Sequence, residues 1–349
     1  MASVEFDDFC FYCPIAPAVH PEAGEVDEAA RRWAREMGIG TGTRQERSDY
    51  GQMVCRWAPD GDRELLDVAT RHAYVTFALD DLLFDSGPIC RSPDRVSLLV
   101  GRLIRSLVSP EAEPLPSGFA RLDRAVAAQR ACSAEIRAKC RPDTVRRWID
   151  SMVEWYVGAL TVVAHRQMGK VLGFRDYLNL GHMDRAIRYC VVVIQIAEGT
   201  VLPNAELETP LVRAVTEAAY LLVTVDSDLY SYKKEALEGT LEMNVVSALM
   251  QEGHSAGYAA RKAFELRNTV MAVFMQLIRQ AREDASAELL RYLGQLEHLV
   301  RGNLDWGLRA PRYDVQGNAV PFRVVTAPQP DPLVSSALPE IAWWWELVA

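Results

Sequence analysis

Three aspartates at the end of an apolar segment form a candidate metal-binding group. Asp80, Asp81 and Asp85 end an apolar run that has a helical period, and a Ser-Gly-Pro sequence follows. Each carboxylate in the last turn of a helix costs about 0.5 kcal/mol, because that end carries partial negative charge. A hard divalent cation compensates such a group better than arginine or lysine does. The cluster predicts either a metal site or, taken alone, a solvated helix end.

A second group of oxygen ligands lies in the segment DSDLYSYKKE, residues 226–235. Ser227, Ser231 and Glu235 are spaced four residues apart, which places them within an arc of about 80° on one helix face. Two hydroxyls and a carboxylate suit Mg²⁺ when water and a substrate phosphate supply its other ligands. Lys234, beside them, is a candidate phosphate cation. On its own this stripe could also be an exposed polar helix end.

A third group closes the last long helical segment. Arg309, Arg312 and Tyr313 carry donors suited to phosphate oxygens, arginine as a planar fork and tyrosine through its hydroxyl. Alone, the group could simply cap a helix. In sequence order the chain thus presents a carboxylate cluster, an oxygen stripe and a set of cationic and hydroxyl donors.

Almost every long segment of the chain has a helical period, and no run of alternating strands appears. The predicted fold class is therefore all-α. We expect one domain over residues 1–311 and a C-terminal tail over 312–349, whose EIAWWWELVA sequence at 340–349 could form a docking helix, a role that the sequence does not decide. The helices are expected at 23–37, 63–85, 92–107, 118–138, 142–168, 175–198, 208–235, 241–251, 254–283 and 285–309.

Composition excludes several classes of function. Asp and Glu number 47 against 38 Lys and Arg, so the formal net charge of −9 disfavours nucleic-acid binding. No apolar segment is long enough to span a membrane, and the amino-terminal residues do not read as a secretory signal. The seven scattered cysteines indicate reduced thiols, and the CFYC sequence has no second pair to complete a zinc site. We therefore expect a cytoplasmic protein.

Taken together, the three groups resemble the motifs of the bacterial class I terpene synthases (terpene cyclases). DDLLFD at 80–85 resembles the aspartate-rich motif of that family, SDLYSYKKE at 227–235 its N-D-L-x-S-x-x-K-E motif, and RY at 312–313 its C-terminal pair. The Pro-rich entry and first helix at 11–39 and the segment RDYLNL at 175–180 are also similar. The resemblance implies a single helical bundle with metals at the mouth of an apolar cavity.

The same resemblance implies roles for individual residues. Catalysis requires Asp80, Asp81, Arg312 and Tyr313, and the substrate diphosphate binds Arg185, Lys234, Arg312 and Tyr313. The metal ligands, for three Mg²⁺ ions, are Asp80, Asp85, Ser227, Ser231 and Glu235. Tyr74, Phe77 and Trp306 are cavity candidates because they lie about one turn from the motifs, although core packing would account for each equally well.

Two positions depart from the family pattern. Ser227 stands where the family has Asn or Asp, and it is a weaker neutral ligand. The neighbouring Asp226 or Asp228 could replace it as a ligand only if the motif were shifted in register. Gly181 stands at the diphosphate-sensing arginine, while Asp184 and Arg185 follow at the linker and effector positions. Arg185 lies one turn on and could reach back to the diphosphate.

The activity implied is ionisation of an acyclic prenyl diphosphate and cyclisation of the carbocation, with release of diphosphate. Farnesyl diphosphate is the first expectation. Val75, where the family often has Trp, enlarges the cavity floor and makes geranylgeranyl diphosphate the second. A chain-elongating prenyl diphosphate synthase and a non-catalytic helical interaction protein are the alternatives. A homodimer is also possible.

Overall fold

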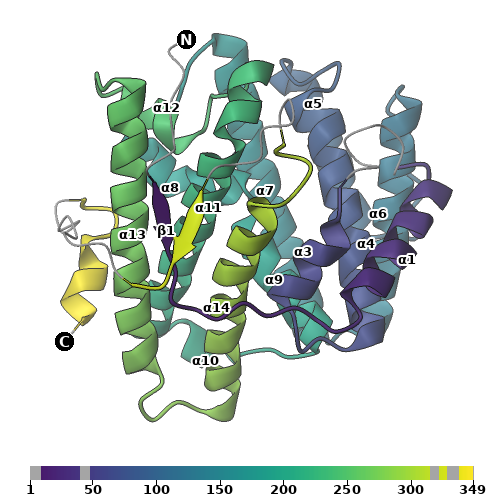
Figure 1. The fold of residues 1–349 in the computed structure, drawn as a ribbon. Helices are drawn as coiled ribbons and strands as arrows, with labels where there is room; N and C mark the ends of the chain where they lie inside the picture. The colour runs from purple at the N-terminus through teal and green to yellow at the C-terminus, as the bar shows by residue number, and fades with distance from the viewer. Residues whose placement is uncertain (1–8, 40–47, 315–321, 328–337, 349) are drawn as a thin grey trace. The chain divides into compact units, whose positions relative to one another are not determined.

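The computed structural model describes residues 9–39, 48–314, 322–327 and 338–348, and it divides into two compact units. Unit 2 comprises Val19–Lys170 and Arg188–Thr200, and unit 1 comprises Met1–Ala18, Val171–Ile187 and Val201–Ala349. Helices dominate both (Figure 1), so the predicted all-α fold class is confirmed for the described residues. One domain over 1–311 with a tail over 312–349 stays a prediction.

Unit 2 is built from helices that pack through one apolar face. α4 is its central helix and contacts α1, α3 and α6, while α5 packs on α7. α1 shows the pattern, since Val26, Ala30 and Ala34 recur every four residues and are all buried. The elements are α1 (Ala23–Glu36), α3 (Tyr50–Trp57), α4 (Arg63–Leu79), the π-helix η1 (Asp80–Asp85), α5 (Pro93–Val108), α6 (Ala120–Lys139), α7 (Pro142–Met168) and α9 (Ile187–Glu198).

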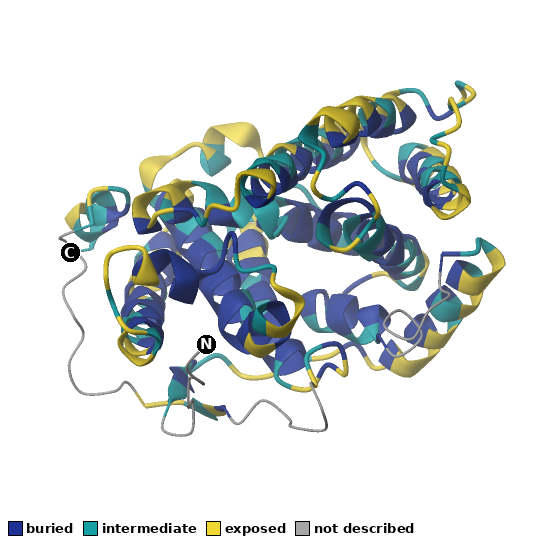
Figure 2. Cartoon of the chain, turned by 90° about the horizontal axis from the view of Figure 1, so that it is seen from above, coloured by how far each residue is buried: buried dark blue, intermediate teal, exposed yellow. Residues whose placement is uncertain are grey.

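Unit 1 is organised around the long helix α11, which contacts α8, α12, α13 and α14. The bidentate ion pair of Asp226 on α11 with Arg267 on α13 is fully buried. The elements are β1 (Cys10–Tyr12), α8 (Phe174–Asp184), α10 (Asn204–Leu207), α11 (Pro210–Glu238), α12 (Val245–Met250), α13 (Ala256–Ala281), α14 (Ala287–Gly307), β2 (Arg323–Val325) and the 3-10 helix η3 (Ala342–Leu347). In Figure 2 the helices carry buried residues along one side and exposed residues along the other.

Most predicted helix limits agree with the structure to within a few residues, but two predictions were wrong in ways that matter. The expected helix at 63–85 changes at Asp80 from an α-helix to a π-helix. The expected helix at 175–198 is broken after Asp184 into α8 and α9, and Ala186 there has a positive φ of 55°. The short helices α3 and α10 were not predicted.

The segments at the two ends of the chain also differ from expectation. β1 and β2 form a parallel two-stranded pair, although no strand was predicted. In the tail, η3 packs on α11 and α13, and its buried Trp344 donates through Nε1 to Glu217 Oε2 at 3.3 Å. The rest of the predicted tail, at 315–321, 328–337 and 349, lies outside the described residues. None of the helices that the structure describes has the length and apolar character needed to cross a membrane.

Candidate active site

The aspartate cluster of unit 2 owes its geometry to η1. In an α-helix, residues five apart lie about 140° apart around the axis, whereas the wider turn of a π-helix, with its i→i+5 bonding, brings them closer to one side. Asp80 and Asp85 thereby come to the same side. One carboxylate oxygen from each of Asp80, Asp81 and Asp85 lies within 4.8 Å of the others, and all three residues are half-buried. This oxygen-only set fits a hard divalent cation.

The end of η1 is held by a cation from another helix. The Arg166 side chain of α7, 3% exposed, donates through Nη1 to the backbone oxygen of Phe84, and also to those of Asp85 at 3.3 Å and Cys90 at 3.4 Å. Gly87 completes the turn, because a Cβ there would lie 1.7 Å from the backbone oxygen of Leu82. A compensating positive charge near the aspartates was expected from the sequence, but Arg166 was not identified as its source.

The oxygen stripe of unit 1 lies on α11 where this helix meets α8 and α12. Ser231 Oγ donates to Glu235 Oε1 at 2.8 Å, so two predicted ligands are already together. Both residues are buried, with 4% and 6% of their surface exposed. The Ser231 hydroxyl and the Glu235 carboxylate offer oxygen atoms of the kind that Mg²⁺ takes as ligands.

Ser227 lies at the other end of the stripe and contacts Tyr230. Its Oγ is 3.0 Å from the Tyr230 hydroxyl, which donates to Asn303 Oδ1 on α14 at 3.2 Å. Burial raises the pKa of Tyr230 well above its usual range, so this hydroxyl keeps its proton. The Tyr230 ring lies against Gly307, where a Cβ would approach it to 2.1 Å.

One of the predicted C-terminal donors, Tyr313, lies against Tyr230 of α11. The Tyr313 ring contacts the rings of Tyr230 and Trp306, with centroid distances of 4.7 and 5.8 Å. Arg312 is buried, with 8% of its surface exposed. Lys234 is also buried and pairs with Glu238 at 3.5 Å. The structure thus brings Tyr313 and Trp306 to the Ser227 end of the stripe.

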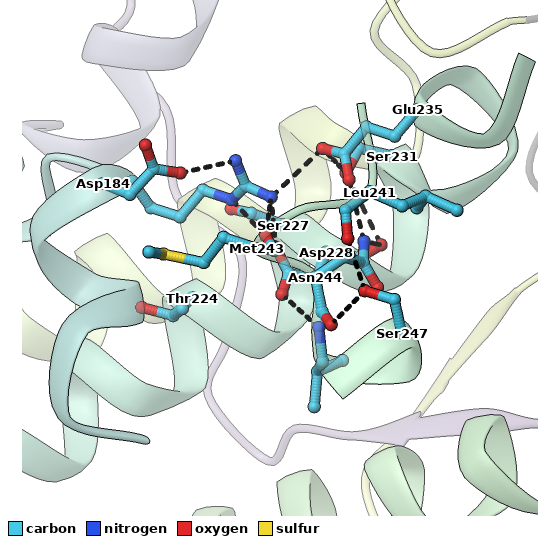
Figure 3. A network of polar contacts seen from close by, with 12 residues as sticks. Asp184, Thr224, Ser227, Asp228, Ser231, Glu235, Leu241, Met243, Asn244 and Ser247 are labelled. Carbon is cyan, nitrogen blue, oxygen red and sulfur yellow. Dashed lines mark hydrogen bonds and ion pairs between the residues drawn. The ribbon is translucent and has the colours of Figure 1, made fainter. Parts of the chain in front are cut away.

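Arg185 has partners that the sequence did not reveal. Its Nε donates to Asp228 Oδ1 at 2.8 Å, Nη1 to Asp184 at 3.0 Å, and Nη2 to Glu235 Oε1 at 3.1 Å. Figure 3 shows this network of polar contacts around α11. Burial raises the pKa of Asp228 to about 6, and Arg185 opposes that shift. Diphosphate binding by Arg185 stays a prediction.

The two aspartates that could replace Ser227 as a ligand in a shifted register, Asp226 and Asp228, have structural roles of their own. Asp226 has both carboxylate oxygens bonded to Arg267, and Asp228 binds Arg185 and the backbone N–H of Val245 at 2.7 Å. Both aspartates are fully buried. These contacts favour Ser227 over either neighbour as the ligand at this end of the stripe.

At Gly181, α8 comes close to α11. A Cβ on this residue would lie 3.1 Å from Thr224 Cγ2 and 3.2 Å from the Tyr177 ring. The close approach explains by packing why glycine occupies a position at which the terpene synthases that the chain resembles carry arginine.

Two of the three cavity candidates lie in unit 2. The Tyr74 hydroxyl donates to Asp27 Oδ1 and to the backbone oxygen of Ser48, both at 3.1 Å. Phe77 stacks on Tyr50 with a centroid distance of 3.9 Å. These contacts pack α4 against α1 and α3, and a place for either ring in a cavity stays a prediction.

Comparison with known proteins agrees with these features. Residues 73–291 match the family described as terpene synthase family 2, C-terminal metal binding. The chain is 34% identical to spiroviolene synthase of Streptomyces violens, over 96% of this chain and 95% of that protein. It is 30% identical to a (+)-T-muurolol synthase of Streptomyces clavuligerus that cyclises farnesyl diphosphate, over 99% of this chain and 84% of that protein.

A solved structure shares the fold as well as the sequence. The crystal structure of the SVS_A2 protein from ancestral sequence reconstruction superposes with a TM-score of 0.83 at 30% identity, covering 97% of this chain and 99% of that one. The sequence-based assignment of family, fold and enzyme class is confirmed. The chain belongs to the bacterial terpene synthases, and it is an all-α, metal-dependent class I terpene synthase.

Proposed function

We propose that this enzyme ionises farnesyl diphosphate, or geranylgeranyl diphosphate as the second choice, and cyclises the carbocation to a terpene hydrocarbon or alcohol. The observation that carries the proposal is that two separate groups of oxygen ligands, on η1 and on α11, occur in a chain of this family. The farnesyl diphosphate specificity in the name of the T-muurolol synthase supports the first choice.

In this proposal Asp80, Asp81 and Asp85 hold metal on η1, and Ser227, Ser231 and Glu235 hold it on α11. Mg²⁺ supplies charge neutralisation of the leaving diphosphate when it is bound. Arg312 and Lys234 contribute fixed positive charge to the diphosphate oxygens, and the Tyr313 hydroxyl donates a hydrogen bond. Three Mg²⁺ ions, a cytoplasmic location and a homodimer stay predictions from the sequence.

After ionisation the chain must hold a carbocation away from water. Trp306 and Phe77 are the rings proposed for this role, because a cation over a desolvated aromatic ring gains up to about 2 kcal/mol. A dry enclosure prevents early capture of the cation by water. The order and geometry of ring closure then depend on how the cavity walls fold the substrate.

The proposal is tested by pyrophosphate release from farnesyl diphosphate in the presence of Mg²⁺. Asp80→Asn is expected to remove most turnover and to leave the circular dichroism of the helices unchanged, because it deletes a metal ligand. Arg312→Ala is expected to weaken binding of inorganic pyrophosphate at least about tenfold, since a charge-assisted hydrogen bond contributes about 1.5–3 kcal/mol. Full turnover by Asp80→Asn would refute the metal site on η1.

A further inference from the structure

Asn244, which the sequence motifs do not include, joins α12 to the α11 ligands. It is fully buried and precedes α12, and its Oδ1 accepts from the backbone N–H of Val246 at 3.0 Å. A backbone N–H can only donate, so this contact fixes which end of the amide is oxygen. The Nδ2 group must therefore face α11 (Figure 3).

Both protons of that Nδ2 group have acceptors on α11. One bond goes to the backbone oxygen of Asp228 at 3.0 Å, and the other goes to Glu235 Oε2 at 2.9 Å. Glu235 Oε1 accepts from Ser231 Oγ at 2.8 Å and from Arg185 Nη2 at 3.1 Å. Three donors from three segments thus fix the Glu235 carboxylate through both of its oxygens.

This arrangement defines what Glu235 can still bind. A carboxylate offers about four lone-pair positions, and three are taken, two on Oε1 and one on Oε2. The remaining position lies on Oε2, the oxygen that Asn244 holds. Arg185 meanwhile keeps Asp228 engaged through Nε at 2.8 Å and Nη2 at 2.6 Å, so that this neighbour does not replace Glu235.

We infer that Asn244 is a positioning residue that, together with Arg185, orients the Glu235 carboxylate for metal binding. The inference rests on the proposed role of Glu235 as a metal ligand. Asn244 acts through Glu235 and is not itself a ligand. Residues that hydrogen-bond a metal ligand in this way typically change metal affinity by about 10- to 100-fold when they are replaced.

The test compares the affinity for Mn²⁺ in the presence of inorganic pyrophosphate, measured by calorimetry or electron paramagnetic resonance, for the parent and Asn244→Ser. Serine keeps an oxygen to cap α12 but is too short to reach Glu235. The expected result is at least about tenfold weaker binding, with turnover recovered at high Mg²⁺. Asn244→Thr, also able to cap the helix, gives the same comparison if the serine variant does not fold.

Ser255→Ala is the matched control, since it removes the cap of α13, where Ser255 Oγ accepts from Tyr258 N at 3.4 Å. It is expected to leave the affinity for Mn²⁺ unchanged. An equal loss in this variant would mean that weakening a helix N-terminus away from Glu235 has the same effect, and the inference would fall.

Glu235→Gln separates the inference from the proposal beneath it. If Glu235→Gln leaves the affinity for Mn²⁺ unchanged, the proposed α11 site is wrong. If it weakens binding while Asn244→Ser does not, only the positioning role is overturned. In the double variant the two losses should not add, because Asn244 acts through Glu235. Additive losses would contradict the inference.

Discussion

The Ser227 hydroxyl lies 3.0 Å from the Tyr230 hydroxyl, three residues further along α11. Tyr230 donates its one proton to Asn303 Oδ1, so Ser227 is the donor of the pair and keeps its lone pairs for a cation. The contact with Tyr230 therefore orients the Ser227 hydroxyl in the proposed metal site despite its short side chain.

Ser227→Asn should lower the Mg²⁺ concentration for half-maximal activity. An amide oxygen is more strongly dipolar than a hydroxyl and reaches further across the helix face. Magnesium titrations of the parent and the variant with one substrate measure the effect. An unchanged or higher requirement would refute Ser227 as a ligand.

Asp226→Asn should lower the free energy of unfolding by about 3 kcal/mol and leave the affinity for Mn²⁺ unchanged. It removes the charged partner of Arg267 from a fully buried pair. Denaturant unfolding measures the loss. Asp150→Asn, in a pair with Arg146 that is largely exposed, is the control and should cost less than about 0.5 kcal/mol. A loss of metal affinity in Asp226→Asn would instead make Asp226 a ligand.

Arg166→Met should raise the Mg²⁺ requirement about tenfold, because the backbone oxygens that end η1 lose their cation. Arg137→Met is a matched control. Arg137 Nη2 donates to the backbone oxygens of Leu107 at 2.9 Å and Val108 at 2.8 Å, at the end of α5, away from the aspartates. Both variants can lose stability, but only Arg166→Met should change the magnesium titration. Equal titrations for the two variants would show that Arg166 does not position the cluster.

His72 should make the fold less stable in acid. Its Nδ1 lies 2.7 Å from the Tyr189 hydroxyl, and burial lowers its pKa to about 3. Below its ordinary pKa the unfolded chain binds a proton that the folded chain does not, so the contribution to stability is lost as the pH falls from about 6.5 towards 3.

Below about pH 6, the unfolding free energy of the parent should therefore fall, relative to that of His72→Gln, by about 1.4 kcal/mol for each unit by which the pH is lowered. Urea unfolding at several pH values measures this slope. A difference that does not depend on pH would mean that His72 is protonated in the folded protein.

How much the sequence could predict depends on whether the deciding interaction is local. The helix at 142–168 was predicted to the residue, because Pro142 starts it and Gly169, with a φ of 64°, ends it. The spacing of Asp80 and Asp85 is the signal that could have indicated η1, since these residues share a face only in a π-helix.

The interactions that surround the proposed ligands on α11 could not be predicted in this way. Arg185, Asn244 and Glu235 are far apart in the sequence, and their contacts depend on how α8 and α12 pack on α11. Serines and a glutamate at helical spacing identify a candidate stripe. Which donors hold that stripe is decided only by tertiary packing.

Analysis of the reaction products tests whether this enzyme cyclises a prenyl diphosphate. The parent enzyme is incubated with geranyl, farnesyl and geranylgeranyl diphosphate in turn, with Mg²⁺ or with EDTA, and the extract is analysed by gas chromatography and mass spectrometry. We expect a cyclic hydrocarbon or alcohol of fifteen carbons from farnesyl diphosphate, or failing that of twenty from geranylgeranyl diphosphate, only when Mg²⁺ is present. A longer linear prenyl diphosphate, or no product from any substrate with Mg²⁺, would contradict the account.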